Sequence, residues 1–155
     1  MYTQFEPENC HWLFPVFEQP DLKAALSMTC VVPHDWVVVS NDNTDPSKDG
    51  EHAAISTSLE SIADSFGQKE AWSNIDKPHH FCFKTTPRIS SYLYAIVVGP
   101  YDYIEHIEDG FPPMRIYARK TLMPIDGTEM FRVTRVGMKA YKEFFGREYP
   151  FGKYD

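Results

Sequence analysis

The spacing of hydrophobic positions divides the chain into a long β-like part and a shorter helical part. Residues 92–98 (YLYAIVV) are the most hydrophobic run and predict a buried central strand that ends at Gly99 and Pro100. Residues 26–32 and 36–39 predict a hairpin-like pair of strands. Further strands are predicted over residues 81–83, 101–108 and 114–119. Most of the chain is therefore expected to be β structure.

Two segments have the helical period instead. Over residues 128–145, apolar side chains recur three and four positions apart, which predicts a long amphipathic helix. A short helix is predicted over residues 58–66, where Thr57 and Glu60 form a capping box and Gly67 suits the C-terminal end. The predicted fold class is therefore mainly β, followed by a small α/β segment with one long helix.

Composition and charge narrow the function classes. Aromatic residues make up 15% of the 155 residues, and the 12 prolines favour β structure with many turns. The net charge of -7 disfavours a nucleic-acid partner and an anionic membrane surface. No apolar run approaches the roughly 20 residues that cross a bilayer, so no membrane span is expected. The widely separated Cys10, Cys30 and Cys82 argue against a disulfide scaffold and favour a cytoplasmic or other reducing intracellular compartment.

One group of side chains near the middle of the chain could bind a soft metal ion. His79, His80 and Cys82 lie within four positions, and in a strand His80 and Cys82 would share a face. The sequence has no second pair of ligands at the spacing of a metal site. Strand-edge histidines and a buried thiol are therefore the favoured interpretation.

A second group is acidic and contains a histidine. Glu105, His106, Glu108 and Asp109 include a carboxylate–histidine pair of the kind that transfers protons in catalysis. Neither HExxH nor HxxEH occurs in the sequence, so a solvated loop face is favoured over an active site. The basic side of the long helix is similarly expected to be solvated or to pack on the domain.

Five segments in collinear order point further. They are YTQFEP at residues 2–7, FPVFEQPDLKA at 14–24, KTTPRISSYLYAIVVGPYD at 84–102, PPMRIYARKTL at 112–122 and YPFGKYD at 149–155. Together they resemble the M1 family of zinc aminopeptidases (gluzincins). The first three resemble its N-terminal β domain, and the last two resemble the beginning of its catalytic domain.

The resemblance implies a domain organisation. Residues 1–108 would be part of the aminopeptidase N-terminal domain, a saddle-like β-sandwich, and residues 109–155 would start the thermolysin-like catalytic domain. The sequence stops before the family's GAMEN and HExxH motifs. Zinc is the cofactor of the parent family, but no cofactor, metal ligand or catalytic residue is expected in this chain. The chain by itself is expected to be inactive.

Two substrate-binding residues follow from the resemblance. The residue at the Glu6 position of the family binds the free α-amino group of a peptide substrate, and the Gln4 position borders the first side-chain pocket. Alternation along an extended segment would place Gln4 and Glu6 on one side. The family often has a cis peptide bond after that acid, so the Glu6–Pro7 bond is expected to be cis, which proline permits at low cost.

Some positions depart from the family pattern. Val16 and Glu18 replace the usual Cys and Asp of the FPCFD motif, and His11 and Trp12 occupy positions that are commonly Arg. The longer Glu18 side chain is expected to lose a local hydrogen bond.

Two functions therefore remain open. The chain is expected to contribute the amine-binding edge of an M1 aminopeptidase cleft, with a peptide N-terminus as its partner. Alternatively, it is a catalytically dead, truncated aminopeptidase-like protein that acts as a structural or accessory subunit. In that case a protein partner or self-association would cover its exposed sheet edges.

Overall fold

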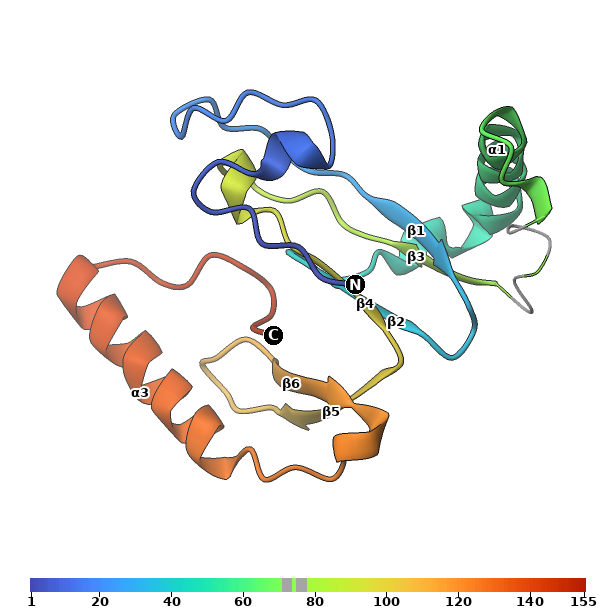
Figure 1. Cartoon of the computed structure of the whole chain (residues 1–155). Coiled ribbons are helices and arrows are strands. Elements are labelled where there is room, and N and C mark those ends of the chain that lie inside the picture. The colour runs from blue at the N-terminus through green and yellow to red at the C-terminus, as the bar shows by residue number, and fades with distance from the viewer. Residues whose placement is uncertain (71–73, 75–77) are drawn as a thin grey trace. The chain divides into compact units, whose positions relative to one another are not determined.

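The computed structural model describes residues 1–70, 74 and 78–155 (Figure 1). It divides into two compact units, residues 1–99 and residues 100–155. The first unit contains two antiparallel strand pairs and a helix, and the second contains a β-hairpin and a long helix. This composition confirms the predicted fold class.

The strands of the first unit are β1 (Thr29–Val32), β2 (Val37–Ser40), β3 (His79–Cys82) and β4 (Ile96–Gly99). The predicted hairpin of the first two is wrong, because β1 pairs with β3 and β2 pairs with β4. These long-range pairings bury Val32, Val38, Phe83 and Val98 in one core cluster. Burial of the four apolar side chains outweighs the local turn signal between β1 and β2.

The hydrophobic run at residues 92–98 is a strand only in its second half. Its first half includes a 3-10 turn over Ser91–Leu93. The Asn41 side chain takes the place of a strand partner there: its amide donates to the Leu93 carbonyl at 2.8 Å, and its oxygen accepts the Ala95 N–H at 2.9 Å. The prediction of a strand over the whole run is therefore wrong, because a side chain satisfies this backbone.

Helix α1 (His52–Ser65) covers most of the segment predicted at residues 58–66. The helix begins earlier than predicted, directly after a 3-10 helix over Pro46–Glu51. Thr57 consequently lies inside the helix, so its predicted role at the N-cap is wrong. Gly67 has a φ of 69°, the left-handed conformation that ends helices, and this confirms the predicted C-terminal end.

The second unit consists of β5 (Tyr101–His106), β6 (Met114–Arg119) and α3 (Thr128–Phe145). The bounds of α3 are those predicted from the sequence. Gly146 follows in the left-handed conformation, with its N–H donating to the Lys142 carbonyl at 2.9 Å. The predicted domain junction at residues 108 and 109 lies in the β5–β6 connection and stays a prediction.

The start of α3 packs closely on the hairpin. A Cβ atom at Gly127 would lie 2.4 Å from Ile104 Cδ1 and 2.8 Å from Ile116 Cδ1, so only glycine fits without a shift. Phe131, one turn into the helix, is buried and stacks on His106 at 5.3 Å between ring centroids. These contacts bury one face of α3 against β5 and β6.

A candidate substrate-binding edge at the N-terminal segment

The predicted substrate-binding residues lie on a segment that is hydrogen-bonded along β4 (Figure 1). The Val98 N–H donates to the Met1 carbonyl at 2.8 Å, and the Thr3 N–H donates to the Ile96 carbonyl at 3.0 Å. The Thr3 hydroxyl oxygen accepts the Ile96 N–H at 2.9 Å. The segment therefore acts as a short additional strand at the edge of the β2–β4 pair.

An aromatic cluster anchors this segment from its inner side. Phe5 is buried, and its ring meets the edge of Phe14 at 6.4 Å between centroids. Phe14 in turn stacks on Tyr94 at 6.0 Å, and the Tyr94 hydroxyl donates to the Ala24 carbonyl at 3.0 Å. Phe5 therefore fixes the segment on the first unit between the two predicted site residues.

Gln4 and Glu6 flank Phe5 in the sequence, and both are exposed. Neither side chain forms a hydrogen bond or an ion pair with another residue in the part of the chain that the structure describes. An amide and a carboxylate thus project into solvent from a fixed backbone. Their role in binding an amine stays a prediction.

A tight turn fixes the backbone immediately after this pair. The Glu6–Pro7 bond is cis, which confirms that prediction. The Asn9 N–H donates to the Phe5 carbonyl at 2.7 Å, and the Asn9 side-chain amide donates to the Glu6 carbonyl at 3.2 Å. Asn9 was not among the predicted site residues; its signal in the sequence is an amide three residues after Glu6 in a proline-containing turn.

His11 and Glu18 form a second support beside the turn. The backbone N–H of His11 donates to Glu18 Oε1 at 3.0 Å, and His11 Nδ1 lies 2.5 Å from Glu18 Oε2. Burial of the carboxylate opposes ionisation, but the hydrogen bonds from His11 outweigh it and hold the pKa of Glu18 below its ordinary value. Glu18 thus has a local hydrogen-bond partner, and the loss of a bond relative to the shorter Asp stays a prediction. Two of the four departures from the family pattern, His11 and Glu18, contact each other.

The histidine and cysteine side chains of β3 do not converge on one point. His79 is exposed and packs its ring on Phe81 at 4.4 Å between centroids, whereas Cys82 is buried. Among the described residues, no three His, Cys, Asp or Glu side chains are grouped so that they could hold a metal ion.

The acidic cluster is a set of ion pairs within the second unit. His106 Nε2 lies 3.1 Å from Glu108 Oε2, and Arg135 of α3 also donates to Glu108. Glu105 accepts a hydrogen bond from Arg115 at 2.7 Å. The hydrogen bonds from His106 and Arg135 hold the pKa of Glu108 below its ordinary value. The favoured interpretation of a solvated face is thus incomplete, because Glu108 ties the hairpin to α3.

Comparison with known proteins agrees with the five sequence segments. The family model described as the peptidase M1 N-terminal domain matches residues 1–61. Aminopeptidase N of Streptomyces lividans is 36% identical over all of this chain, which covers 15% of that relative. These matches support an N-terminal segment of an M1 family aminopeptidase.

Other M1 relatives agree. Aminopeptidase M1 of Arabidopsis thaliana is 29% identical over 99% of this chain and 14% of the relative. Aminopeptidase N of Acetobacter pasteurianus is 26% identical over the whole chain and 36% of the relative. This chain thus spans about 15% of the length of the Streptomyces and Arabidopsis relatives. Gln4 and Glu6 lie within the matched N-terminal domain, whereas α3 lies outside it.

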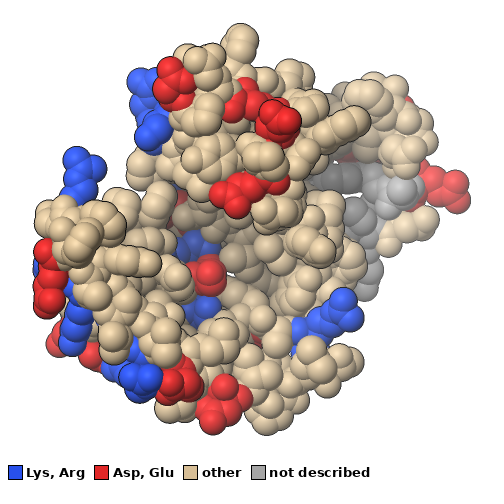
Figure 2. Space-filling view, turned by 60° about the vertical axis from the view of Figure 1, so that its left-hand side comes forward, with Lys and Arg blue, Asp and Glu red and all other residues tan. Residues whose placement is uncertain are grey.

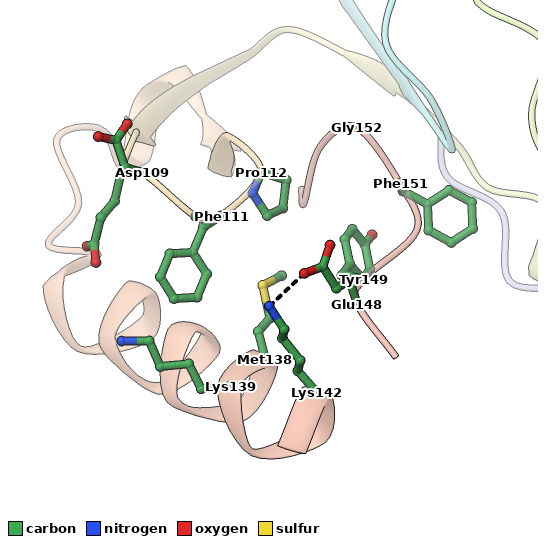
Figure 3. Close-up of a pocket in the computed structure, with 12 residues that line it drawn as sticks. Asp109, Phe111, Pro112, Met138, Lys139, Lys142, Glu148, Tyr149, Phe151 and Gly152 are labelled. Carbon is green, nitrogen blue, oxygen red and sulfur yellow. Dashed lines mark hydrogen bonds and ion pairs between the residues drawn. The ribbon is translucent and has the colours of Figure 1, made fainter. Parts of the chain in front are cut away.

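The second unit has a cavity of about 600 Å³. It lies between α3, the β5–β6 connection and the C-terminal segment (Figure 3). Lys142 donates to Glu148 at 2.6 Å across one side, and Lys139 lies over the Phe111 ring at 5.4 Å. These two lysines already contact groups of the same unit, so neither is a free cation that could bind a ligand in the cavity.

The remaining charged groups do not favour another class of partner. On the face shown in Figure 2, acidic and basic side chains are interspersed. Arg132 of α3 is paired with Glu129 at 2.6 Å, so the basic side of the helix is engaged within the unit. In the described part of the chain, no helix combines the length and the apolar character needed to cross a membrane.

Proposed function

We propose that this chain provides the edge of an M1 aminopeptidase cleft that binds the free α-amino group of a peptide substrate. Glu6 supplies the carboxylate, and Gln4 borders the pocket for the first side chain. The observation that supports this proposal is an exposed carboxylate without a partner among the described residues, on a backbone fixed by Phe5 and Asn9. In this proposal the chain is inactive alone, and zinc and the residues that bind it belong to the rest of the aminopeptidase.

The chemistry of the exposed pair suits an ammonium group. A carboxylate accepts a charge-assisted hydrogen bond from R–NH₃⁺, and such bonds are shorter and stronger than neutral ones. Because the backbone at Glu6 is already held, little conformational entropy is lost when the carboxylate meets its ligand. Gln4 carries no charge and offers both a donor and an acceptor, which suits a pocket rim.

A chimera tests this proposal. This chain would replace the aligned stretch of Streptomyces lividans aminopeptidase N, and hydrolysis of aminoacyl substrates would be measured. Glu6→Gln keeps the size and removes the charge, and Glu8→Gln is the matched control at a neighbouring exposed acid. We expect Glu6→Gln to raise KM about ten- to a hundredfold, as befits loss of a hydrogen bond to a charged group. Equal KM values for the two variants would count against the proposal.

A second function, as a non-catalytic subunit, is supported by a different observation. Several large apolar side chains of α3 are exposed, including Tyr141 and Phe144. Exposed apolar surface of this kind marks interaction sites in many proteins. The molar mass of the purified chain in solution tests this function, and a stable, folded monomer would argue against it.

A further inference from the structure

Helix α3 has two apolar faces, and the described chain covers only one of them. Phe131 faces the β5–β6 hairpin and is buried. On the other side Met130, Val133, Tyr141 and Phe144 are exposed, from 54% at Val133 to 82% at Phe144. Helices of globular proteins normally expose a polar face, so a second apolar stripe implies a second packing partner.

Gly137 lies in the middle of this outer face. No atom of the described chain lies within 4 Å of the position that a Cβ atom would take there. Glycine weakens a helix interior, and its presence there usually has a packing reason. At Gly127 the hairpin isoleucines provide such a reason, but at Gly137 no group among the described residues provides one.

The sizes of the side chains along the outer face describe the shape that it accepts. Met130 and Val133 form a raised end, Gly137 and Ala140 form a low centre, and the aromatic end around Tyr141 rises again. Small residues at the centre allow another backbone to approach closely. Larger residues on both sides form ridges, as at the crossing point of two packed helices.

We propose that the outer face of α3 docks a helix from the remainder of an M1 aminopeptidase, crossing at Gly137. This inference rests on the proposed function in one respect: both take this chain to be part of an M1 aminopeptidase. The length of the relatives supports it, because about 85% of the Streptomyces lividans and Arabidopsis enzymes lies outside the stretch that this chain matches.

Two basic side chains of α3 are already engaged within the unit. Arg135 and Lys142 pair with Glu108 and Glu148, so neither presents a free cation to an apolar occupant of the outer face. A second copy of the chain is the alternative occupant, and it would appear as a dimer of the isolated chain.

The isolated chain provides the first half of the test. Gly137→Ala and Gly137→Leu both place a better helix former where the chain leaves open space. We expect each to raise the thermal midpoint of the isolated chain by about 2–4 °C. A fall in the midpoint of the isolated Gly137→Leu variant would overturn the proposal, because it would show that the described chain itself requires glycine.

The chimera with Streptomyces lividans aminopeptidase N provides the second half. There we expect Gly137→Leu to lower the midpoint by about 5 °C or more, because the added side chain separates the two helices. The matched control is Arg132→Leu, which places the same side chain on the polar side of α3 and should leave the midpoint nearly unchanged.

Three results would overturn the proposal. The first is a chimera that Gly137→Leu stabilises as it does the isolated chain. The second is an unsubstituted chimera that does not fold, because the face then does not fit the remainder of the enzyme. The third is an isolated chain that dimerises and that Val133→Glu returns to a monomer, which assigns the face to a second copy. The Glu6 proposal is read separately, from KM, so either proposal can fail alone.

Discussion

Glu6 of the first unit differs from three carboxylates of the second unit in how it is engaged. In the second unit Glu105, Glu108 and Glu148 are each paired with an Arg or a Lys of the same unit. In the first unit Glu6 is exposed and has no partner among the described residues, although its backbone is held from both sides. A group that is fixed in position but left unpaired is available to a ligand, whereas a paired group stabilises the fold.

The same contrast separates two adjacent positions in the N-terminal segment, Phe5 and Glu6. Phe5→Ala is expected to destabilise the isolated chain by about 3–5 kcal/mol, because it removes a buried ring from the aromatic cluster. Glu6→Gln, the matched control, should change the free energy of unfolding by no more than about 0.5 kcal/mol. Urea denaturation of both variants measures this difference. Similar losses of stability in the two variants would show that Glu6 stabilises the fold, as Phe5 does, and would contradict this prediction.

Acid should weaken the pairing of Glu108 with His106 and Arg135 in the second unit. The pKa of Glu108 is lowered in the folded chain, so its stabilising effect is present above the ordinary value of about 4.3 and is lost as pH falls through the lowered pKa. We expect the thermal midpoint of Glu108→Gln to depend less on pH below about 4.3 than that of the unsubstituted chain.

Thermal midpoints over a pH series test this prediction, with Glu6→Gln as the control. Glu6→Gln should keep the acid dependence of the unsubstituted chain. If the Glu108→Gln profile also matches that of the unsubstituted chain, the pairing with His106 and Arg135 contributes nothing to folding.

Local patterns in the sequence were sufficient for some elements and insufficient for others. The bounds of α3 were predictable, because its spacing of three and four and the following Gly146 are both local signals. The pairing of β1 with β3 was not, because it depends on which apolar side chains meet across long separations in the sequence. The late start of the predicted strand, at Ile96 and not at Tyr92, depends in the same way on Asn41, which is distant in the sequence.

The candidate site shows the same division. Alternation along the segment predicted that Gln4 and Glu6 share one side, and in the structure both are exposed while Phe5 between them is buried. The supports of this segment were not predicted. Asn9 contacts it through a turn, and His11 finds its partner in Glu18 only because the chain folds back over residues 13–17. Contacts of this kind depend on tertiary structure and have no periodic signal.

The most direct test of the Glu6 assignment compares two inhibitors that differ only in whether they carry the free α-amino group. Their inhibition constants would be measured on the Streptomyces chimera, on its Glu6→Gln variant and on its Glu8→Gln variant. We predict that the ratio of the two inhibition constants, which measures the benefit of the α-amino group, shrinks about tenfold or more in Glu6→Gln and is retained in Glu8→Gln. An advantage of the same size in all three enzymes would contradict it.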